Sequence, residues 1–237
     1  MSGRLGCLAV VPARGGSKRI PRKNIKPFLG IPLMARTIAV LHDSGVFDRI
    51  VVSTDDDEIA DVAIRAGAEV PFRRPDELAN DTTATIPVIS HAILALESLG
   101  WRGDLCCCAY PAAVLTRPGD YRTAFDMLRL DPPPDYVFTA TSFPHPIQRA
   151  LRSVEGGGAE MFWPEHRQTR SQDLEPAFHD AGQFYFGLRD AWTEARPLFS
   201  STSQMLVLPR YRVQDIDTQE DWDRAEMLAR ILMNESP

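Results

Sequence analysis

The chain has 237 residues, a net charge of −6 and 44% apolar residues, which suits one α/β domain with a sizeable core. The acidic balance argues against a nucleic-acid partner, because a surface that follows phosphates normally carries a broad excess of Lys and Arg. The sequence has no run of about 18 apolar residues and no secretory signal pattern, so we expect a cytoplasmic protein that does not engage a membrane.

Three of the four cysteines, Cys106, Cys107 and Cys108, are consecutive inside an apolar run. Neighbouring strand residues point to opposite faces, so three in a row make poor partners for one metal ion or one disulfide. We expect them to be small buried strand residues in a reducing compartment.

The first half of the chain alternates predicted strands and helices. The strands are expected at 8–11, 49–53, 69–72, 105–109 and 136–141, and the helices at about 33–44, 55–66, 85–99 and 118–128. Thr82 or Thr83 is expected to cap the third helix. Single helices between strands imply right-handed crossovers and a mostly parallel, doubly wound sheet, whose ligands lie beyond the carboxyl ends of the strands.

The pattern changes after about residue 143. A hairpin is expected around three glycines at 156–158, and the polar stretch 164–176 is predicted to be a mobile loop or an arm that reaches a partner subunit. Strands are then expected at 182–187 and 211–216, followed by a helix at about 219–233. The sequence therefore predicts a single domain over 1–237 in which 143–178 is an insertion.

The loop after the first predicted strand carries two adjacent glycines, Gly15 and Gly16, among six cations. The cations are Arg14, Lys18, Arg19, Arg22, Lys23 and Lys26. Glycines let backbone N–H groups approach phosphates, and Arg and Lys neutralise them, so this loop predicts a polyphosphate site. It matches neither GxGxxG nor GxxxxGK[ST], which disfavours an NAD-linked oxidoreductase and a P-loop ATPase.

The same loop resembles the signature of the nucleotidyltransferases that make CMP-activated sugar acids. The matching residues are Pro12, Ala13, Arg14, Ser17, Lys18, Lys23 and Asn24. The resemblance implies a Rossmann-like nucleotidyltransferase sheet with a small β-rich dimerisation insertion, in which Arg14, Lys18 and Lys23 are catalytic and stabilise the pyrophosphate leaving group. It also implies that the backbone from Ala13 through Gly15, Gly16 and Ser17 cradles CTP, and that Asn24 lies between the phosphates and the sugar.

A second stretch, VSTDDDEIA followed by RRPxxLAxD, resembles the same family in order and spacing. The resemblance places Arg74, with Thr82 or Thr83, around the cytosine and ribose. The three aspartates at 55–57 also have a simpler explanation, as negative charge at a helix N-terminus. Tyr110 stands where sialic-acid members have a glutamine that touches the base, and the family branch that activates pseudaminic acid tends to have a tyrosine there.

Two carboxylates near the C-terminus, Asp215 and Asp217, are candidate metal ligands. If they lie on a strand, alternate residues share a face, and the two carboxylates repel unless a cation lies between them. Mg²⁺ suits such a pair, with phosphate oxygens and water in its remaining positions. The alternative is that Asp217 caps the following helix, which leaves Asp215 as the safer ligand. The resemblance favours the metal.

The sugar-acid pocket of the family is built from stretches that correspond here to 143–151 and 178–185. On this resemblance the sugar-binding residues are Asn24, Gln148, Arg149, His179, Gln183 and Phe184. Arg149 is expected to pair with the substrate carboxylate. His179 is alternatively a structural residue, and one of Phe184 and Tyr185 is expected to be core because they alternate in a strand.

These stretches, PIQRAL and FHDAGQFY, resemble the branch that activates pseudaminic acid, a nine-carbon sugar acid. We therefore expect an enzyme that transfers CMP from CTP to the anomeric hydroxyl of a nonulosonic acid, with Mg²⁺ and as a homodimer that exchanges the insertion. N-acetylneuraminic or legionaminic acid remains an alternative substrate, and the eight-carbon acid of the lipopolysaccharide core is disfavoured by Arg22 and Asn24. A nucleotide-binding protein without turnover is the alternative from another class.

Overall fold

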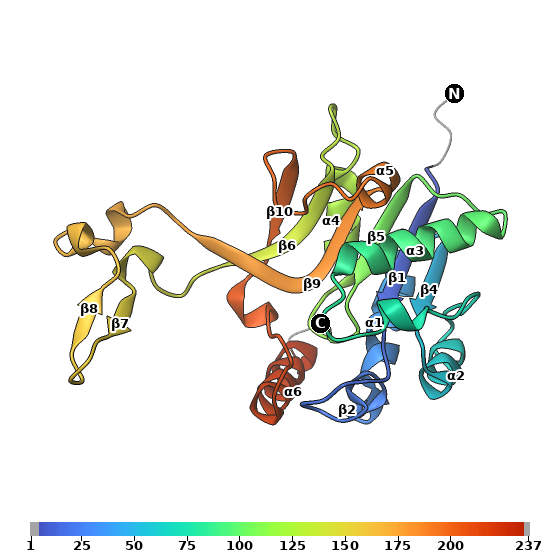
Figure 1. The fold of residues 1–237 in the computed structure, drawn as a ribbon, viewed down its shortest axis with the longest axis horizontal. Helices are drawn as coiled ribbons and strands as arrows, with labels where there is room; N and C mark the ends of the chain where they lie inside the picture. Colours follow the sequence, from blue (N-terminus) through green and yellow to red (C-terminus); the bar gives the residue numbers. More distant parts are fainter. Residues whose placement is uncertain (1–4, 235–237) are drawn as a thin grey trace.

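A computed structural model describes residues 5–234 as a body built on one six-stranded sheet, from which an arm projects (Figure 1). The strand order is β10-β6-β9-β5-β1-β4, and β9 alone runs antiparallel to its neighbours. The strands are β1 Cys7–Pro12, β4 Arg49–Ser53, β5 Leu105–Ala109, β6 Tyr136–Ser142, β9 Phe178–Leu188 and β10 Ser203–Val207. The predicted mostly parallel α/β sheet is confirmed.

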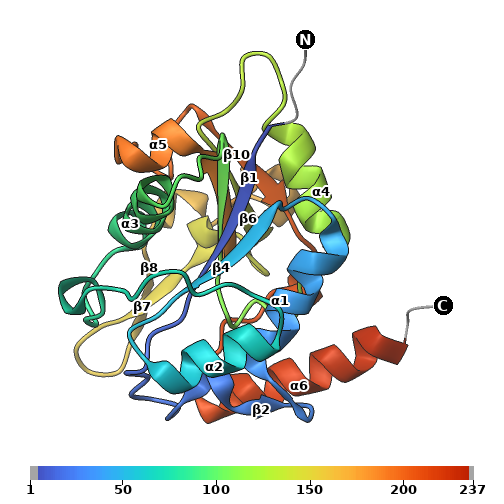
Figure 2. The same ribbon diagram turned by 90° about the vertical axis from the view of Figure 1, so that its right-hand side faces the viewer.

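Helices cover both faces of this sheet (Figure 2). One face packs against α1 Leu33–Ser44, α2 Asp57–Arg65 and α4 Pro118–Met127, and the other against α3 Thr85–Ser98 and α5 Arg189–Thr193. Side chains of β1 alternate between the two faces of the sheet. Ala9 and Val11 pack on the side of α1, α2 and α4, and Leu8 and Val10 pack on the side of α3 and α5. The last helix, α6 Gln219–Asn234, buries Trp222 and Ala225 against the chain that follows the N-terminal loop.

Short elements complete the described chain. They are the strands β2 Pro27–Phe28 and β3 Ile31–Pro32 and the 3₁₀ turns η1 Lys23–Ile25, η2 Asp76–Leu78, η3 Ile147–Arg149, η4 Pro164–His166, η5 Ser171–Asp173 and η6 Arg210–Arg212. No helix within residues 5–234 is long and apolar enough to cross a membrane. Cys106, Cys107 and Cys108 are buried in β5, where burial raises the pKa of each thiol, as expected of structural residues.

Several predicted elements are wrong. Residues 69–72 do not form a strand, because only Glu69 makes a bridge, to Val51. Residues 211–216 are a 3₁₀ turn followed by extended chain that pairs with no strand, whereas β10, which was not predicted, pairs with β6 at the edge of the sheet. Neither Thr82 nor Thr83 caps α3, whose N-cap position is Ala84.

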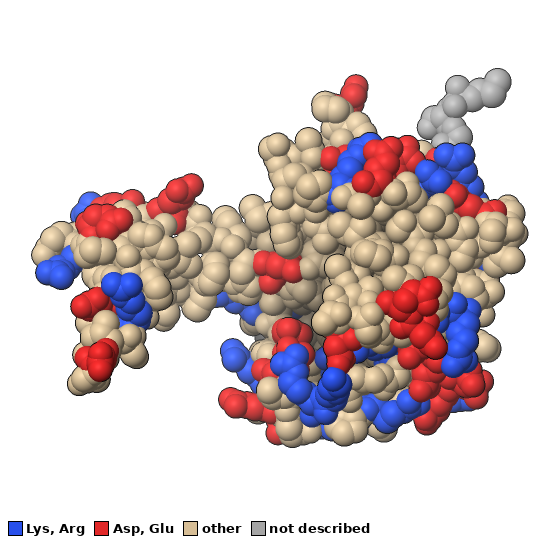
Figure 3. Space-filling model, in the orientation of Figure 1, with Lys and Arg blue, Asp and Glu red and all other residues tan. Residues whose placement is uncertain are grey.

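The arm is the segment 143–178, between the end of β6 and the start of β9. It leaves the body where β6 and β9 extend together, and it carries an antiparallel hairpin of β7 Leu151–Ser153 and β8 Ala159–Met161. Figure 3 shows a narrow neck between arm and body whose visible face is almost free of charge. The arm exposes large apolar side chains, namely Phe143, Leu151, Phe162, Trp163 and Phe178.

Candidate functional site

A cleft of about 470 Å³ opens at the carboxyl ends of β1 and β5, where a doubly wound sheet binds its ligands. It brings together predicted residues that are far apart in the sequence. These are Arg14, Ser17, Lys18, Lys23, Asn24, Arg74, Thr83, Tyr110, Asp215 and Asp217. The N-terminal loop, the start of α3 and the segment before α6 thus form the walls of one site.

The N-terminal loop is held in shape by the start of α2. The backbone N–H of Gly15 donates a 3.1 Å hydrogen bond to Oδ1 of Asp55. A Cβ at Gly15 would lie 2.7 Å from Oδ2 of Asp56, so only glycine fits against this carboxylate. Asp56 is itself fixed, because it accepts from Arg22 at 2.5 Å and caps α2 by accepting from the N–H of Ile59 at 2.9 Å.

The aspartates at 55–57 therefore serve the loop and the helix together. The interpretation as helix N-terminal charge is confirmed for Asp56 and Asp57, and Asp55 adds a direct bond to the loop. Arg22 stands in the left-handed region at φ 56°, and its guanidinium pairs with Asp56 and Glu58. The Arg22 guanidinium holds the pKa of the Asp56 carboxyl below its usual range.

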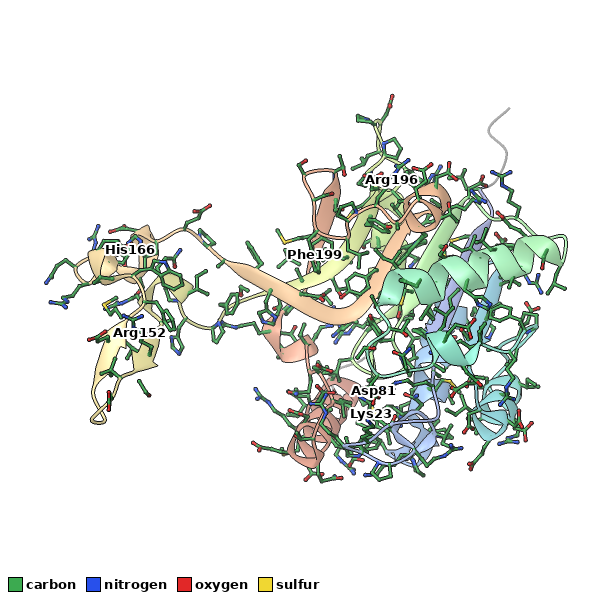
Figure 4. All side chains as sticks on the ribbon, in the orientation of Figure 1. Lys23, Asp81, Arg152, His166, Arg196 and Phe199 are labelled. Carbon is green, nitrogen blue, oxygen red and sulfur yellow. The ribbon has the colours of Figure 1, made fainter. Side chains whose placement is uncertain are left out.

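Two of the predicted phosphate-binding cations share one counter-ion. Arg14 and Lys18 both pair with the carboxylate of Asp81, and these pairs lower the pKa of Asp81. Asp81 and Lys23 come from distant parts of the chain and lie at the same end of the sheet in Figure 4. A triphosphate that binds Arg14 and Lys18 has to displace the Asp81 carboxylate from these two cations, because the negative charges of the phosphates and of Asp81 repel each other at close range.

Lys23 and Asn24 tie the loop to the rest of the cleft. The Nζ of Lys23 donates to the carbonyl oxygen of Ile216 at 2.6 Å and lies 3.7 Å from Oδ1 of Asp217. The amide of Asn24 is buried and donates to the carbonyl oxygen of Arg14 at 3.0 Å. Both side chains still line the cleft, so they bind the protein backbone and face the ligand space together.

The two candidate metal ligands stand side by side without the predicted strand. Ile216 between them is fully buried, which directs the chain so that Asp215 and Asp217 both line the cleft. Burial of the Asp215 carboxyl raises its pKa, and the negative charge of Asp217 raises it further. Asp217 pairs with Arg19 at 2.8 Å, and the remaining charge of the two carboxylates favours a further cation at Asp215.

Asp217 does not cap the last helix. Thr218 and Asp221 form a reciprocal pair there, in which the N–H of Asp221 donates to Oγ1 of Thr218 at 3.2 Å and the N–H of Thr218 donates to Oδ2 of Asp221 at 2.8 Å. Residues 5–234 contain no group of three or more His, Cys, Asp or Glu that could hold a metal ion. Two carboxylates with room for phosphate oxygens fit Mg²⁺, which binds few protein ligands and keeps several waters.

The residues predicted around the base and ribose divide into two groups. Arg74 lines the cleft but is only 4% exposed, since its Nε donates to Oγ of Ser53 at 3.1 Å and its Nη2 to the Ser53 carbonyl. Thr83 and Tyr110 also line the cleft, and the hydroxyl of Tyr110 shares a hydrogen bond with Thr85. Thr82 bonds Asn80 and does not line the cleft.

The predicted sugar-binding residues of β9 need correction. Phe184 is fully buried and stacks on Tyr121 at 4.6 Å between ring centroids, so it belongs to the core and its prediction as a sugar contact is wrong. Gln183 is 2% exposed and donates to the carbonyl oxygen of Arg212 at 2.6 Å, which removes it from the cleft surface. Tyr185, the residue that alternates with Phe184, lines the cleft instead.

Three more of the predicted sugar-binding residues, Gln148, Arg149 and His179, lie on or near the arm. His179 is exposed at the base of the arm, with its ring 4.9 Å from that of Phe143. Gln148 donates to the carbonyl oxygen of Glu175 at 3.0 Å, and Arg149 donates to Oγ of Ser171 at 3.2 Å, both within the arm. None of the three lines the cleft of its own chain.

Sequence reasoning missed other residues of the cleft. Asp81, Thr85, Gly182 and Tyr185 all line it, and none was assigned a role. Asp81 closes the RRPxxLAxD motif, so its presence in that pattern was a usable signal. Tyr185 was one of two alternating candidates, and only the packing of β9 decides between them.

Comparison with known proteins identifies the family of this chain. Residues 8–144 match the family model described as Cytidylyltransferase. The chain is 43% identical over 224 residues to the pseudaminic acid cytidylyltransferase of Campylobacter jejuni, covering 94% of this chain and 96% of the relative. It is 31% identical to the CMP-N,N'-diacetyllegionaminic acid synthase of Legionella pneumophila, again covering 94% and 96%.

Solved structures agree on the fold. A CMP:2-keto-3-deoxy-manno-octonic acid synthetase complexed with CTP has a TM-score of 0.69 at 15% identity, over 96% of this chain and 99% of that one. A 4-diphosphocytidyl-2C-methyl-D-erythritol synthase of Anaerococcus prevotii has a TM-score of 0.60 at 14% identity, over 96% and 100%. With the family model spanning more than half of the chain and the fold and cleft in agreement, this protein belongs to the cytidylyltransferase family.

Proposed function

We propose that this protein transfers CMP from CTP to the anomeric hydroxyl of pseudaminic acid and releases pyrophosphate. The observation that carries the proposal is the cleft in which the cations of the N-terminal loop face Asp215 and Asp217. The near full-length similarity to a pseudaminic acid cytidylyltransferase supports the choice of sugar acid. The expectation of a cytoplasmic enzyme stays a prediction.

The reaction needs positioning and charge neutralisation more than a covalent nucleophile. The sugar hydroxyl attacks the α-phosphorus in line with the leaving pyrophosphate. Arg14, Lys18 and Lys23 line the cleft and would neutralise the negative charge that develops on the leaving group. The glycines at 15 and 16 let the loop backbone approach the phosphates.

Asp215 and Asp217 would hold Mg²⁺, which when bound neutralises phosphate charge and favours ionisation of an oxygen ligand. Lys23 fixes the peptide between these carboxylates through the Ile216 carbonyl, so the loop and the metal ligands keep one relative position. Replacing Asp215 by Asn should weaken Mn²⁺ binding, measured by electron paramagnetic resonance, as well as the rate. Unchanged Mn²⁺ binding would contradict the assignment.

The sugar acid can be tested directly. Purified protein with CTP, Mg²⁺ and a panel of pseudaminic, legionaminic and N-acetylneuraminic acids should release pyrophosphate fastest with pseudaminic acid. Preference for legionaminic acid would instead favour the function named for the Legionella relative. If the protein binds CTP but releases no pyrophosphate with any sugar acid, it is a nucleotide-binding protein without turnover, and the proposed enzymatic activity is wrong.

We also propose that the chain forms a homodimer in which the arm of one subunit reaches the cleft of the other. Gln148 and Arg149 lie on the arm and do not line the cleft of their own chain, and the arm exposes Leu151, Phe162 and Trp163. In this arrangement Arg149 pairs with the substrate carboxylate across the interface, and 143–178 acts as a dimerisation and sugar-binding insertion.

A complementation experiment tests the exchange. Variants Arg149→Ala and Lys23→Met should each be nearly inactive. When the two are mixed in equal amounts by refolding or co-expression, about half of the dimers are hybrids, and one of the two clefts in each hybrid contains neither substitution. The mixture should therefore regain about a quarter of the wild-type activity. Light scattering gives the oligomeric state. A monomer, or a dimer whose mixture stays inactive, would contradict the proposal.

A further inference from the structure

Strand β9 is irregular where it passes the cleft. Its pairing with β6 slips, so that Phe138 faces Tyr185 while Ala140 faces Asp180, and the residues between Asp180 and Tyr185 bulge opposite Thr139. Gly182 in this bulge has φ +60°, a left-handed conformation that favours glycine, and it lines the cleft. A bulge next to a binding site redirects side chains, and here it turns Asp180 back toward Tyr185.

The carboxylate of Asp180 is held on both oxygens. Oδ1 accepts from the N–H of Gly182 at 2.9 Å, and Oδ2 accepts from the hydroxyl of Tyr185. Tyr185 lines the cleft, and its ring meets that of Tyr110 edge to face at 5.9 Å. Asp180 is thus an exposed carboxylate whose orientation is fixed by a residue of the cleft wall.

Asp180 does not itself line the cleft; it lies at the edge, where its carboxylate accepts from Gly182 and Tyr185, which do line the cleft. Burial raises the pKa of Tyr110, and the negative charges of Asp180 and Asp215 add to this effect. Both carboxylates therefore act on the same phenol, one from the bulge of β9 and one from the segment before α6. No cation pairs with Asp180 among the ion pairs of residues 5–234, so this negative charge is not neutralised within the described chain.

We propose that Asp180 is a specificity-determining acceptor that receives a hydrogen bond from a hydroxyl or amide N–H of the sugar acid. An ionised carboxylate only accepts, and two protein donors leave about two of its four lone-pair sites for the substrate. The same charge repels the substrate carboxylate and so orients that group away from β9. This inference rests on the proposed function, since it assigns the recognition of the second substrate.

Tyr185 is a positioning residue in this scheme. Without its hydroxyl the carboxylate keeps its charge but loses one of its two anchors, so the acceptor no longer has a fixed direction. A fixed acceptor discriminates between stereoisomers, because the donor of the wrong isomer lies elsewhere and the acceptor stays unpaired. Asp180 and Tyr185 together therefore select the configuration of the sugar acid.

The experiment compares Asp180→Asn, Asp180→Glu and Tyr185→Phe with the control Asp190→Asn, an exposed carboxylate that pairs with Arg189 on α5. Steady-state kinetics with pseudaminic acid should show KM for the sugar acid raised about 10- to 100-fold in Asp180→Asn and less in Tyr185→Phe, as expected for one lost charge-assisted hydrogen bond. Asp180→Glu keeps an acceptor and should recover part of the loss, and the control should behave as wild type.

Two further readouts separate recognition of the sugar from a structural role. The Kd for CTP, measured by calorimetry without sugar acid, should stay within about twofold of wild type in every variant, since no variant removes a phosphate contact. The preference for pseudaminic over legionaminic acid should fall in Asp180→Asn and Tyr185→Phe. An unchanged KM for the sugar acid, or a parallel loss of CTP affinity, would overturn the role of Asp180. A wild-type protein inactive with every sugar acid would instead overturn the proposed function and this inference with it.

Discussion

The Nζ of Lys23 lies 2.6 Å from the carbonyl oxygen of Ile216, so one hydrogen bond joins the N-terminal loop to the segment of the two candidate metal ligands. The two residues are 193 positions apart in the chain. Lys23 also stands 3.7 Å from Asp217, where it offsets part of the repulsion between the two carboxylates. The loop that would bind phosphate and the pair that would bind Mg²⁺ are therefore held as one unit.

Replacing Lys23 by Met should remove this link and one cation of the cleft together. We expect kcat to fall about 100-fold or more, because a positioned cation on the leaving group contributes at this scale. Pyrophosphate release at saturating CTP and sugar acid measures the effect. Lys26→Met is the matched control, since Lys26 lies outside the cleft over the ring of Trp222. Equal losses of kcat in the two variants would show that Lys23 acts only through the net charge of the protein.

Asp81→Asn should strengthen the binding of CTP. Asp81 pairs with Arg14 and Lys18, and removing its charge frees both cations for the triphosphate. We expect Kd for CTP to fall about three- to tenfold at low ionic strength and the difference to shrink in about 0.5 M salt, because exposed pairs are screened. Calorimetry measures both values. Weaker binding in the variant would show that Asp81 contributes to the nucleotide site and does not compete for it.

Gly15→Ala should damage the loop more than Gly16→Ala. The new Cβ at Gly15 would lie 2.7 Å from Oδ2 and 3.2 Å from Cβ of Asp56, which Arg22 holds in place, whereas at Gly16 the nearest atom is 3.9 Å away. We expect Kd for CTP to rise about tenfold in Gly15→Ala, as the loop shifts to relieve the clash, and less in Gly16→Ala. Similar values for the two variants would mean that the contact with Asp56 does not shape the loop.

Asp56 should contribute to stability in a pH-dependent manner. Its pKa is lowered in the folded protein, first by the hydrogen bond from Arg22, so its stabilisation is present above the unfolded-state pKa and is lost as pH falls through the lower folded value. Asp56→Asn keeps an N-cap acceptor and loses the ion pair, which is partly exposed and is expected to contribute at most about 1 kcal/mol. Asp56→Ala loses the cap as well, at a further cost of about 1 kcal/mol.

Urea denaturation at several pH values measures these differences. The gap between wild type and Asp56→Asn should be largest near neutral pH and should close in acid, where the wild-type carboxyl is protonated. The gap between the Asn and Ala variants should persist, because an amide oxygen accepts a hydrogen bond at any pH. A wild-type advantage that is constant over the whole range would contradict the charge-based explanation.

The predicted site residues that the structure brings together in the cleft come from short stretches whose local pattern carries the information. The loop from Arg14 to Asn24 combines glycines with cations at a fixed spacing, and the structure lines the cleft with Arg14, Lys18 and Lys23. Asp215 and Asp217 also reach the cleft, although the reason differs from the prediction. Both line the cleft while Ile216 between them is buried, and these residues belong to no strand.

The misplaced residues lie where packing decides between alternatives that look equal in sequence. Phe184 and Tyr185 are adjacent aromatic residues of one strand and are buried on opposite faces of the sheet, and only the tertiary structure shows that Tyr185 is the one that also lines the cleft. Strand β10, SQMLV, has weak local signals and forms through pairing with β6 at the edge of the sheet. Residues 211–216 looked like a strand but find no partner strand.

The sequence by itself determined the fold class, the phosphate-binding loop and the kind of chemistry, because alternating apolar runs and a dense motif are properties of neighbouring residues. Only the tertiary structure decided the relationships between distant residues, namely the pairing of Asp81 with Arg14 and Lys18 and the hydrogen bond from Lys23 to the Ile216 carbonyl. Each joins separate elements whose relative position follows from the packing of the sheet and its helices. Such contacts have no signature in either segment alone.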